Sequence, residues 1–200
     1  MFSSLLPPLA LCLTLIASGA APAASAQKSF EASQQKVLDL VHADAKDAAL
    51  EKEVDQFIDY EYLAQQSLGG ADNYHKRCEA RCDEFESLLT QLIRHNYLAR
   101  IRQSENGSIS YTGEEYRQNG TMAKVDTRVD FKKDGKDQSV EVDYVMHKDD
   151  ASWKVRDIYT DGVGLAKTYR HEFKQMHQEG GIDLLIERLQ AKVDSLKSNS

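Results

Sequence analysis

The chain has 200 residues, and its 32 acidic and 25 basic side chains give a formal net charge of −7 at pH 7. An acidic surface repels phosphate backbones at long range, and no basic arm or basic–aromatic pattern offsets that repulsion, which argues against nucleic-acid binding. The length suits one domain with a sizeable core.

The amino terminus predicts a signal peptide. Residues 9–17 are almost wholly apolar, and Ala24-Ser25-Ala26 supplies the small–x–small pattern that signal peptidase reads. The apolar run is far shorter than the ~20 residues of a membrane-spanning helix. We therefore expect an exported chain that is cleaved near Ala26, with a single domain over residues 27–200.

Helical spacing of apolar residues dominates positions 29–103. Residues 30–41 predict a first helix, and residues 54–68 predict a second helix that ends at Gly69-Gly70. A long third helix follows, with Asp72 or Asn73 as its N-cap and an apolar stripe that runs to Ile101.

Two cysteines, Cys78 and Cys82, lie four residues apart on one face of this third helix. An exported compartment permits a disulfide, but we favour two small buried apolar residues, because closing so short a loop contributes little to stability. Zinc binding is the least favoured interpretation, because two thiolates with only His75 nearby do not complete a tetrahedral site. The redox state of the pair stays open.

Between residues 108 and 159 the apolar period changes from 3.6 to 2. Residues 123–131 and 140–146 alternate between apolar and polar side chains, which predicts strands with one buried and one solvated face. Asn119-Gly120 and Asp134-Gly135 accept the positive φ angles of tight hairpins. The pattern predicts an antiparallel meander of about four strands.

Two further amphipathic helices are predicted on either side of Gly180-Gly181. The order of elements is helices, then a meander, then helices. This order predicts an α+β domain in which amphipathic helices cover a curved antiparallel sheet of about four strands.

Catalytic motifs are missing from the sequence, which has neither an H-E-x-x-H pattern nor a G-x-S-x-G elbow. Asp157 is the one candidate general base. We favour a structural role for it, either capping the turn that follows or holding Lys167 or Arg170, because no partner acid or nucleophile stands in a matching position.

A basic stripe of Lys167, Arg170 and Lys174 lies along one side of the predicted helix. It suits a phosphate headgroup or an acidic partner, although a solvated face is the default interpretation. The nine tyrosines suit either the mouth of an apolar cavity or an ordinary core, and the sequence does not separate the two.

Three stretches carry a resemblance to a known family. Residues 57–69 are similar to an F-D-x-x-x segment that ends in Leu-Gly, and residues 85–97 to an F-x-x-L-L-x-x-x-Y helix. Residues 153–173 are similar to a W-K-V-x-D signature that continues to Y-R-x-x-F. The chain resembles the MlaC-type periplasmic phospholipid-binding proteins, the toluene-tolerance auxiliary family of lipid ABC transporters. One departure is Gly164, which stands where the family usually has serine.

The resemblance implies a sheet of the nuclear-transport-factor-like kind with a helical subdomain, and a periplasmic, monomeric binding protein that is not an enzyme. Phospholipid would be its cargo, and no cofactor or metal is implied. Its partners would be an outer-membrane lipoprotein complex and an inner-membrane lipid ABC transporter complex, in a system that maintains outer-membrane lipid asymmetry and organic solvent tolerance. The alternative is a non-lipid adaptor or chaperone-like module with a filled core.

Under this hypothesis, acyl chains insert between the sheet and the helices. The cavity would be formed by inward side chains of the strands and by facing side chains of the helices, with the basic stripe at the headgroup or at a partner. The floor would be Val125, Val129, Val142, Tyr144 and Met146, and the walls Phe57, Tyr60, Leu88, Leu92, Tyr97, Val163, Leu165, Tyr169 and Phe173.

Overall fold

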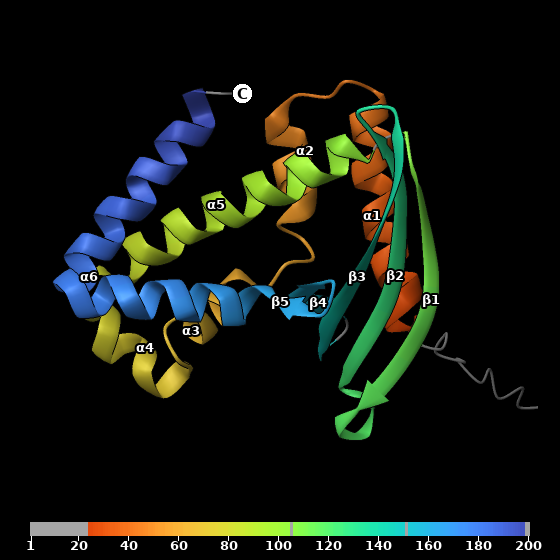
Figure 1. Ribbon diagram of the computed structural model, residues 1–200. Coiled ribbons are helices and arrows are strands. Elements are labelled where there is room, and N and C mark those ends of the chain that lie inside the picture. Colours follow the sequence, from red (N-terminus) through yellow and green to blue (C-terminus); the bar gives the residue numbers. More distant parts are fainter. Residues whose placement is uncertain (1–23, 105, 151, 199–200) are drawn as a thin grey trace, which may run out of the picture.

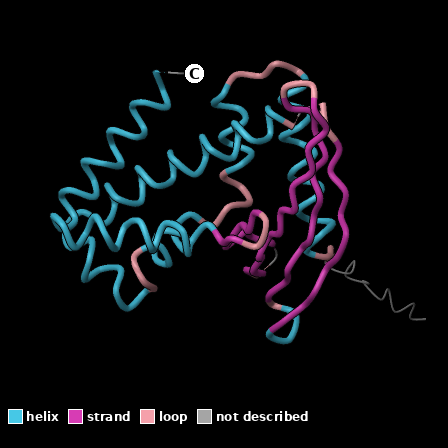
Figure 2. The backbone as a smooth tube through the Cα atoms, viewed as in Figure 1, coloured by secondary structure: helices cyan, strands magenta, loops and turns pink. Residues whose placement is uncertain are grey.

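The computed structural model describes residues 24–104, 106–150 and 152–198. Most of the predicted signal peptide lies outside these residues. Helices and strands occupy different parts of the molecule, with a curved sheet on one side and most of the helices extending away from it (Figure 2).

The sheet has five antiparallel strands in the order of the sequence, which confirms the predicted meander and adds a short edge strand. The strands are β1 (Ser108–Arg117), β2 (Met122–Lys133), β3 (Lys136–Asp149), β4 (Ser152–Thr160) and β5 (Val163–Gly164).

Two tight turns of the sheet, between β2 and β3 and between β4 and β5, use Asp-Gly pairs. Asp134 and Gly135 have φ angles of 51° and 76°, and Asp161 and Gly162 have φ angles of 48° and 79°. Two-residue hairpins of type I′ need positive φ at both positions, which glycine and aspartate accept at low cost. Asn119 and Gly120 also have positive φ, in the short 3₁₀ helix η2 (Gln118–Gly120) between β1 and β2.

The other helical elements of the described residues complete the fold, and α1 runs along the sheet while α5 and α6 extend away from it (Figure 1). They are α1 (Ala26–His42), α2 (Asp47–Val54), α3 (Tyr60–Ser67), α4 (Ala71–Cys78), the 3₁₀ helix η1 (Glu79–Arg81), α5 (Cys82–Gln103) and α6 (Leu165–Ser198).

The predicted helix over residues 54–68 is wrong, because a tertiary contact interrupts it. The amide of Asp59 donates to the carbonyl of Val155 at 2.9 Å, and the amide of Val155 donates to the carbonyl of Phe57 at 2.7 Å. Residues 57–59 therefore pair with β4 as a short extended segment. Asp59 then caps α3 by accepting a hydrogen bond from the amide of Tyr62.

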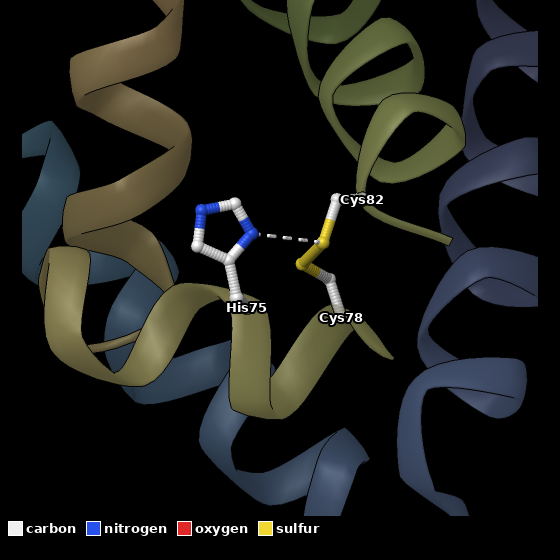
Figure 3. Close-up of side chains that lie close together, drawn as sticks. All are labelled: His75, Cys78 and Cys82. Carbon is white, nitrogen blue, oxygen red and sulfur yellow. Dashed lines mark hydrogen bonds between the residues drawn. A yellow bond between two sulfur atoms is a disulfide. The ribbon is translucent and has the colours of Figure 1, made fainter. Parts of the chain in front are cut away.

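The predicted long third helix is also interrupted. Glu79, with φ of 52°, ends α4 and starts an elbow before α5. At this elbow Cys78 and Cys82 form a disulfide with a Cα–Cα distance of 4.8 Å (Figure 3). The favoured interpretation of free apolar thiols is thus wrong. Its physical reason is the break, which brings the two Cα atoms closer than the ~6 Å of a continuous helix.

The two helices predicted on either side of Gly180-Gly181 are confirmed: both glycines have non-helical backbone angles, and α6 bends sharply there (Figure 1). Gly181 adopts φ of 67° and ψ of −160°, a conformation that side-chain-bearing residues avoid. No helix among the described residues has the length and apolar content that crossing a bilayer requires.

A continuous apolar core joins the sheet to the helices. Phe30 of α1 packs on Tyr144 of β3 with 4.1 Å between ring centroids, and Phe85 of α5 packs on Phe173 of α6 at 5.7 Å. The opposite face of the sheet is charged: the Lys124 ammonium lies between carboxylates of Asp126 and Asp143. The predicted division into a buried and a solvated face is confirmed.

Candidate lipid-binding cavity

A cavity of about 650 Å³ lies between the inner face of the sheet, the second half of α5 and the start of α6. Its volume falls within the ~300–1,000 Å³ of typical ligand sites. Its lining is mainly apolar: the sheet contributes Ile109, Val129, Phe131, Val140, Val142, Tyr144 and Ile158, and the helices contribute Ile93, Tyr97, Ile101, Leu165 and Tyr169.

Exposure of the lining residues distinguishes the mouth of the cavity from its closed end. Arg100 and Gln103 of α5 are exposed, and Val163 of β5 is 61% exposed, which is unusual for a large apolar side chain. Gln34 and Tyr144, by contrast, are only 2% and 4% exposed. The mouth therefore lies where α5 ends and β5 begins, and the closed end lies against α1.

Many of the predicted site residues meet at this cavity although they are far apart in the sequence. Those that line it are Tyr97, Val129, Val142, Tyr144, Val163, Leu165 and Tyr169.

Two predicted floor residues, Val125 and Met146, lie in the packed core instead of on the cavity surface. They have the same inward orientation as Val129 and Val142, but both are fully buried. The two valines that line the cavity lie nearer the β2–β3 hairpin. Alternation along a strand reports the face of the sheet and not the position along it, so it does not distinguish the two groups.

The remaining predicted wall residues also lie outside the lining. Phe173 stacks on Tyr169 at 5.2 Å, and Phe57 packs on Tyr97 at 5.7 Å, so both support side chains that line the cavity. Leu88 and Leu92 are buried in the apolar core. Tyr60 lies under the guanidinium of Arg94.

The predicted basic stripe does not border the cavity. Lys167 and Lys174 are exposed on α6. Arg170 donates from Nε to the carbonyl of Gln66 at 2.9 Å and from a terminal nitrogen to its side-chain oxygen at 3.1 Å. This arginine therefore ties α6 to α3.

Arg100 is the basic residue that lines the cavity, and sequence reasoning missed it. Arg94 of the same helix pairs with Asp55, and Arg102 pairs with Asp47, whereas Arg100 follows Tyr97 by one turn and shares its face. That spacing was the available signal. A cation at the mouth of an apolar cavity suits an anionic headgroup.

The hydroxyl of Tyr169 illustrates the electrostatics of the lining. Burial raises its pKa to about 12, and the nearby Asn96 side chain and Arg100 charge lower it by smaller amounts. The phenol therefore stays neutral at physiological pH. It offers the cavity a hydrogen-bonding hydroxyl and no negative charge.

Gln34 of α1 was not singled out by the sequence reasoning either. It occupies the buried stripe between Phe30 and Val37, and its side-chain oxygen accepts a hydrogen bond from the Tyr111 hydroxyl at 2.7 Å. An amide at an otherwise apolar helical position was the signal in the sequence, because a buried polar group needs a partner.

Asp157 has the structural role that we favoured. One carboxylate oxygen accepts hydrogen bonds from the amides of Ile158 at 2.9 Å and Ala166 at 3.0 Å, so it caps the start of α6. Burial raises its pKa, while the amides that it accepts from oppose that shift.

Gly164 is explained by its surroundings. A Cβ atom there would lie 3.0 Å from the ring of Tyr159 and 3.2 Å from the carboxylate of Asp157. These contacts are tighter than ordinary van der Waals distances, so a serine at this position would displace its neighbours.

Comparison with known proteins agrees with this geometry. A phospholipid-binding protein of Ralstonia solanacearum, solved in complex with a phospholipid, has a similar fold, with a TM-score of 0.72 and 21% sequence identity. The match covers 87% of this chain and 99% of that one. No curated protein matches. The profile of the MlaC protein family matches residues 24–191, and the chain therefore belongs to the MlaC family.

Proposed function

We propose that the protein is a periplasmic phospholipid carrier. It holds acyl chains in the cavity between the sheet and the helices and shuttles them between an outer-membrane lipoprotein complex and an inner-membrane lipid ABC transporter complex. Three observations support this proposal: the mainly apolar cavity of about 650 Å³, the family to which the chain belongs, and the phospholipid bound by the protein of similar fold.

The cavity carries the argument, because an apolar hollow has a large affinity for hydrocarbon. Two acyl chains with ~15 buried methylenes each, at ~0.8 kcal/mol per methylene, correspond to roughly 24 kcal/mol of gross transfer from water. This exceeds the practical ceiling of ~20 kcal/mol on noncovalent affinity. Spontaneous release into water is therefore negligible, and discharge requires a docked partner that offers another apolar path.

The alternatives have less support. An adaptor of this fold would fill the space between sheet and helices with its own side chains, whereas that space is hollow. An enzyme would bring acids and bases together in the cavity. The candidate base Asp157 instead caps α6, and it is not among the residues that line the cavity.

Lipid extraction tests the proposal. Protein purified from its native compartment is extracted with organic solvent, and the extract is analysed by mass spectrometry. We expect phospholipid from the unmodified protein and a loss of most of it from Val142→Arg, because an unpaired charge in the lining is costly to bury. Val145→Arg is the matched control: it lies three residues along β3, on the opposite face.

The control separates a cavity effect from a general effect of arginine on β3. We expect Val145→Arg to retain lipid at the ratio of the unmodified protein. An empty extract from the unmodified protein would favour the adaptor. Normal lipid content in a folded Val142→Arg variant would show that acyl chains lie elsewhere.

A further inference from the structure

Polar side chains meet at the closed end of the mainly apolar cavity. Gln34 of α1, Tyr97 of α5 and Tyr144 of β3 line it, and they are 2%, 7% and 4% exposed. Tyr111 of β1 joins them through its hydrogen bond to the Gln34 oxygen. Four elements thus converge on one polar spot in a site whose other surfaces are largely hydrocarbon.

The Gln34 side-chain oxygen is already engaged, because it accepts a hydrogen bond from the Tyr111 hydroxyl at 2.7 Å. Burial is the main reason why the pKa values of Tyr97 and Tyr144 are raised, so both phenols keep their protons at neutral pH and can donate a hydrogen bond.

Tyr97 shows that one of these donors is unused. Its hydroxyl is buried, and it has no hydrogen-bond partner in the part of the chain that the structure describes. A buried donor without a partner is destabilising, and phenylalanine would fill the same space without that cost. The neighbouring ring is Phe57, which offers no acceptor.

We infer that the closed end of the cavity binds an oxygen atom within the hydrophobic part of the carried lipid, with the Tyr97 hydroxyl as donor. The ligand class is a lipid with a hydroxyl or carbonyl group on an acyl chain, distant from the headgroup. This inference rests on the proposed function, because it requires a lipid tail to reach the closed end. The alternative is that a bound water molecule, and not the lipid, accepts the hydrogen bond from the Tyr97 hydroxyl.

Competition between matched lipids tests this assignment. The probes are phosphatidylglycerols with an sn-2 stearoyl chain that is plain or carries one hydroxyl, placed at successive positions along the chain. Each is competed against a fluorescent phospholipid on the full chain. We compare the affinity for hydroxylated lipid with the affinity for plain lipid. For the best-placed hydroxyl, we expect this ratio to be about three- to tenfold lower in Tyr97→Phe than in the unmodified protein, which corresponds to the loss of one hydrogen bond.

Tyr62→Phe is the control, because it removes a phenol hydroxyl whose ring lies under Arg156 and outside the cavity lining. We expect its affinity ratio to equal that of the unmodified protein. If Tyr97→Phe leaves the ratio unchanged at every hydroxyl position while plain lipid still binds, the closed end holds only water, and this inference fails alone. If neither lipid binds the unmodified protein, the proposed function fails with it.

Discussion

The arginines of α5 make different contacts, and the position of each along the helix decides which contact it makes. Arg94 and Arg102 of α5 turn toward α2 and pair with Asp55 and Asp47, whereas Arg100 lines the mouth of the cavity. The basic residue among those that line the cavity is therefore on α5, and the predicted basic stripe of α6 lies outside the lining. Composition does not distinguish these arginines, but their contacts do.

Arg100→Gln tests this assignment of charge. We expect the dissociation constant for phosphatidylglycerol to rise about three- to fivefold at low salt, because an exposed charge contributes modestly. The difference in affinity between the variant and the unmodified protein should shrink as ionic strength rises, because salt screens the attraction between Arg100 and the headgroup. Titration with a fluorescent phospholipid at several salt concentrations measures both effects.

Lys174→Gln is the matched control, since it removes one positive charge from α6 away from the cavity. An equal loss of affinity in both variants would show that net charge, and not the position of Arg100, attracts the lipid.

At the scale of elements, the start of α1 is integrated into the fold. The Ala24 carbonyl accepts a hydrogen bond from the Trp153 indole at 3.2 Å, and the Ser25 hydroxyl accepts one from the Lys28 amide at 3.2 Å. Ala26 is fully buried. Cleavage directly after Ala26 would remove the cap of α1 together with these contacts.

We predict that signal peptidase cleaves before Ala24. Ala21-Pro22-Ala23 is a second small–x–small sequence, and cleavage after Ala23 would retain the cap. Amino-terminal sequencing of the exported protein should read Ala-Ser-Ala-Gln. A shortened chain that begins at Gln27 should lose about 1–2 kcal/mol of unfolding free energy with its cap. A native amino terminus at Gln27 would contradict the prediction.

For the whole molecule, the abundance of tyrosine couples folding to alkaline pH. Burial is the main reason why the pKa values of Tyr97, Tyr111, Tyr144 and Tyr169 are raised in the folded protein. An unfolded tyrosine releases its proton near pH 10, while these folded residues keep theirs. The unfolded state therefore binds fewer protons above that pH.

The sign of this linkage gives a prediction. The stabilisation is present below pH 10 and is lost as the pH rises, through about 12 for Tyr169. Each such tyrosine contributes a slope of up to ~1.4 kcal/mol per pH unit. Urea unfolding at a series of pH values from 8 to about 11.5 should show a steep decline in unfolding free energy above pH 10.

Tyr169→Phe removes one of these groups. The unfolding free energy of this variant should therefore fall less steeply with pH, by up to ~1.4 kcal/mol per pH unit. A flat profile in the unmodified protein would show that the buried phenols ionise in the folded state as readily as in the unfolded one.

The sequence by itself determined the long strands of the sheet and their buried faces. Alternation over residues 123–131 and 140–146 predicted β2 and β3, and Asp134-Gly135 predicted their hairpin. Inward positions such as Val129 and Val142 followed from the same alternation. These properties are local, because a period of 2 and a turn that needs positive φ depend on neighbouring residues alone.

Only the tertiary structure decided which inward residues surround a hollow. Val125 and Val129 share one face of β2, yet the first is in the packed core and the second lines the cavity. The break at residues 57–59 likewise requires Val155 of β4, almost a hundred positions away. Periodicity identifies the side of an element that leaves water, but a cavity depends on the spacing of elements that are distant in sequence, and no local pattern encodes that spacing.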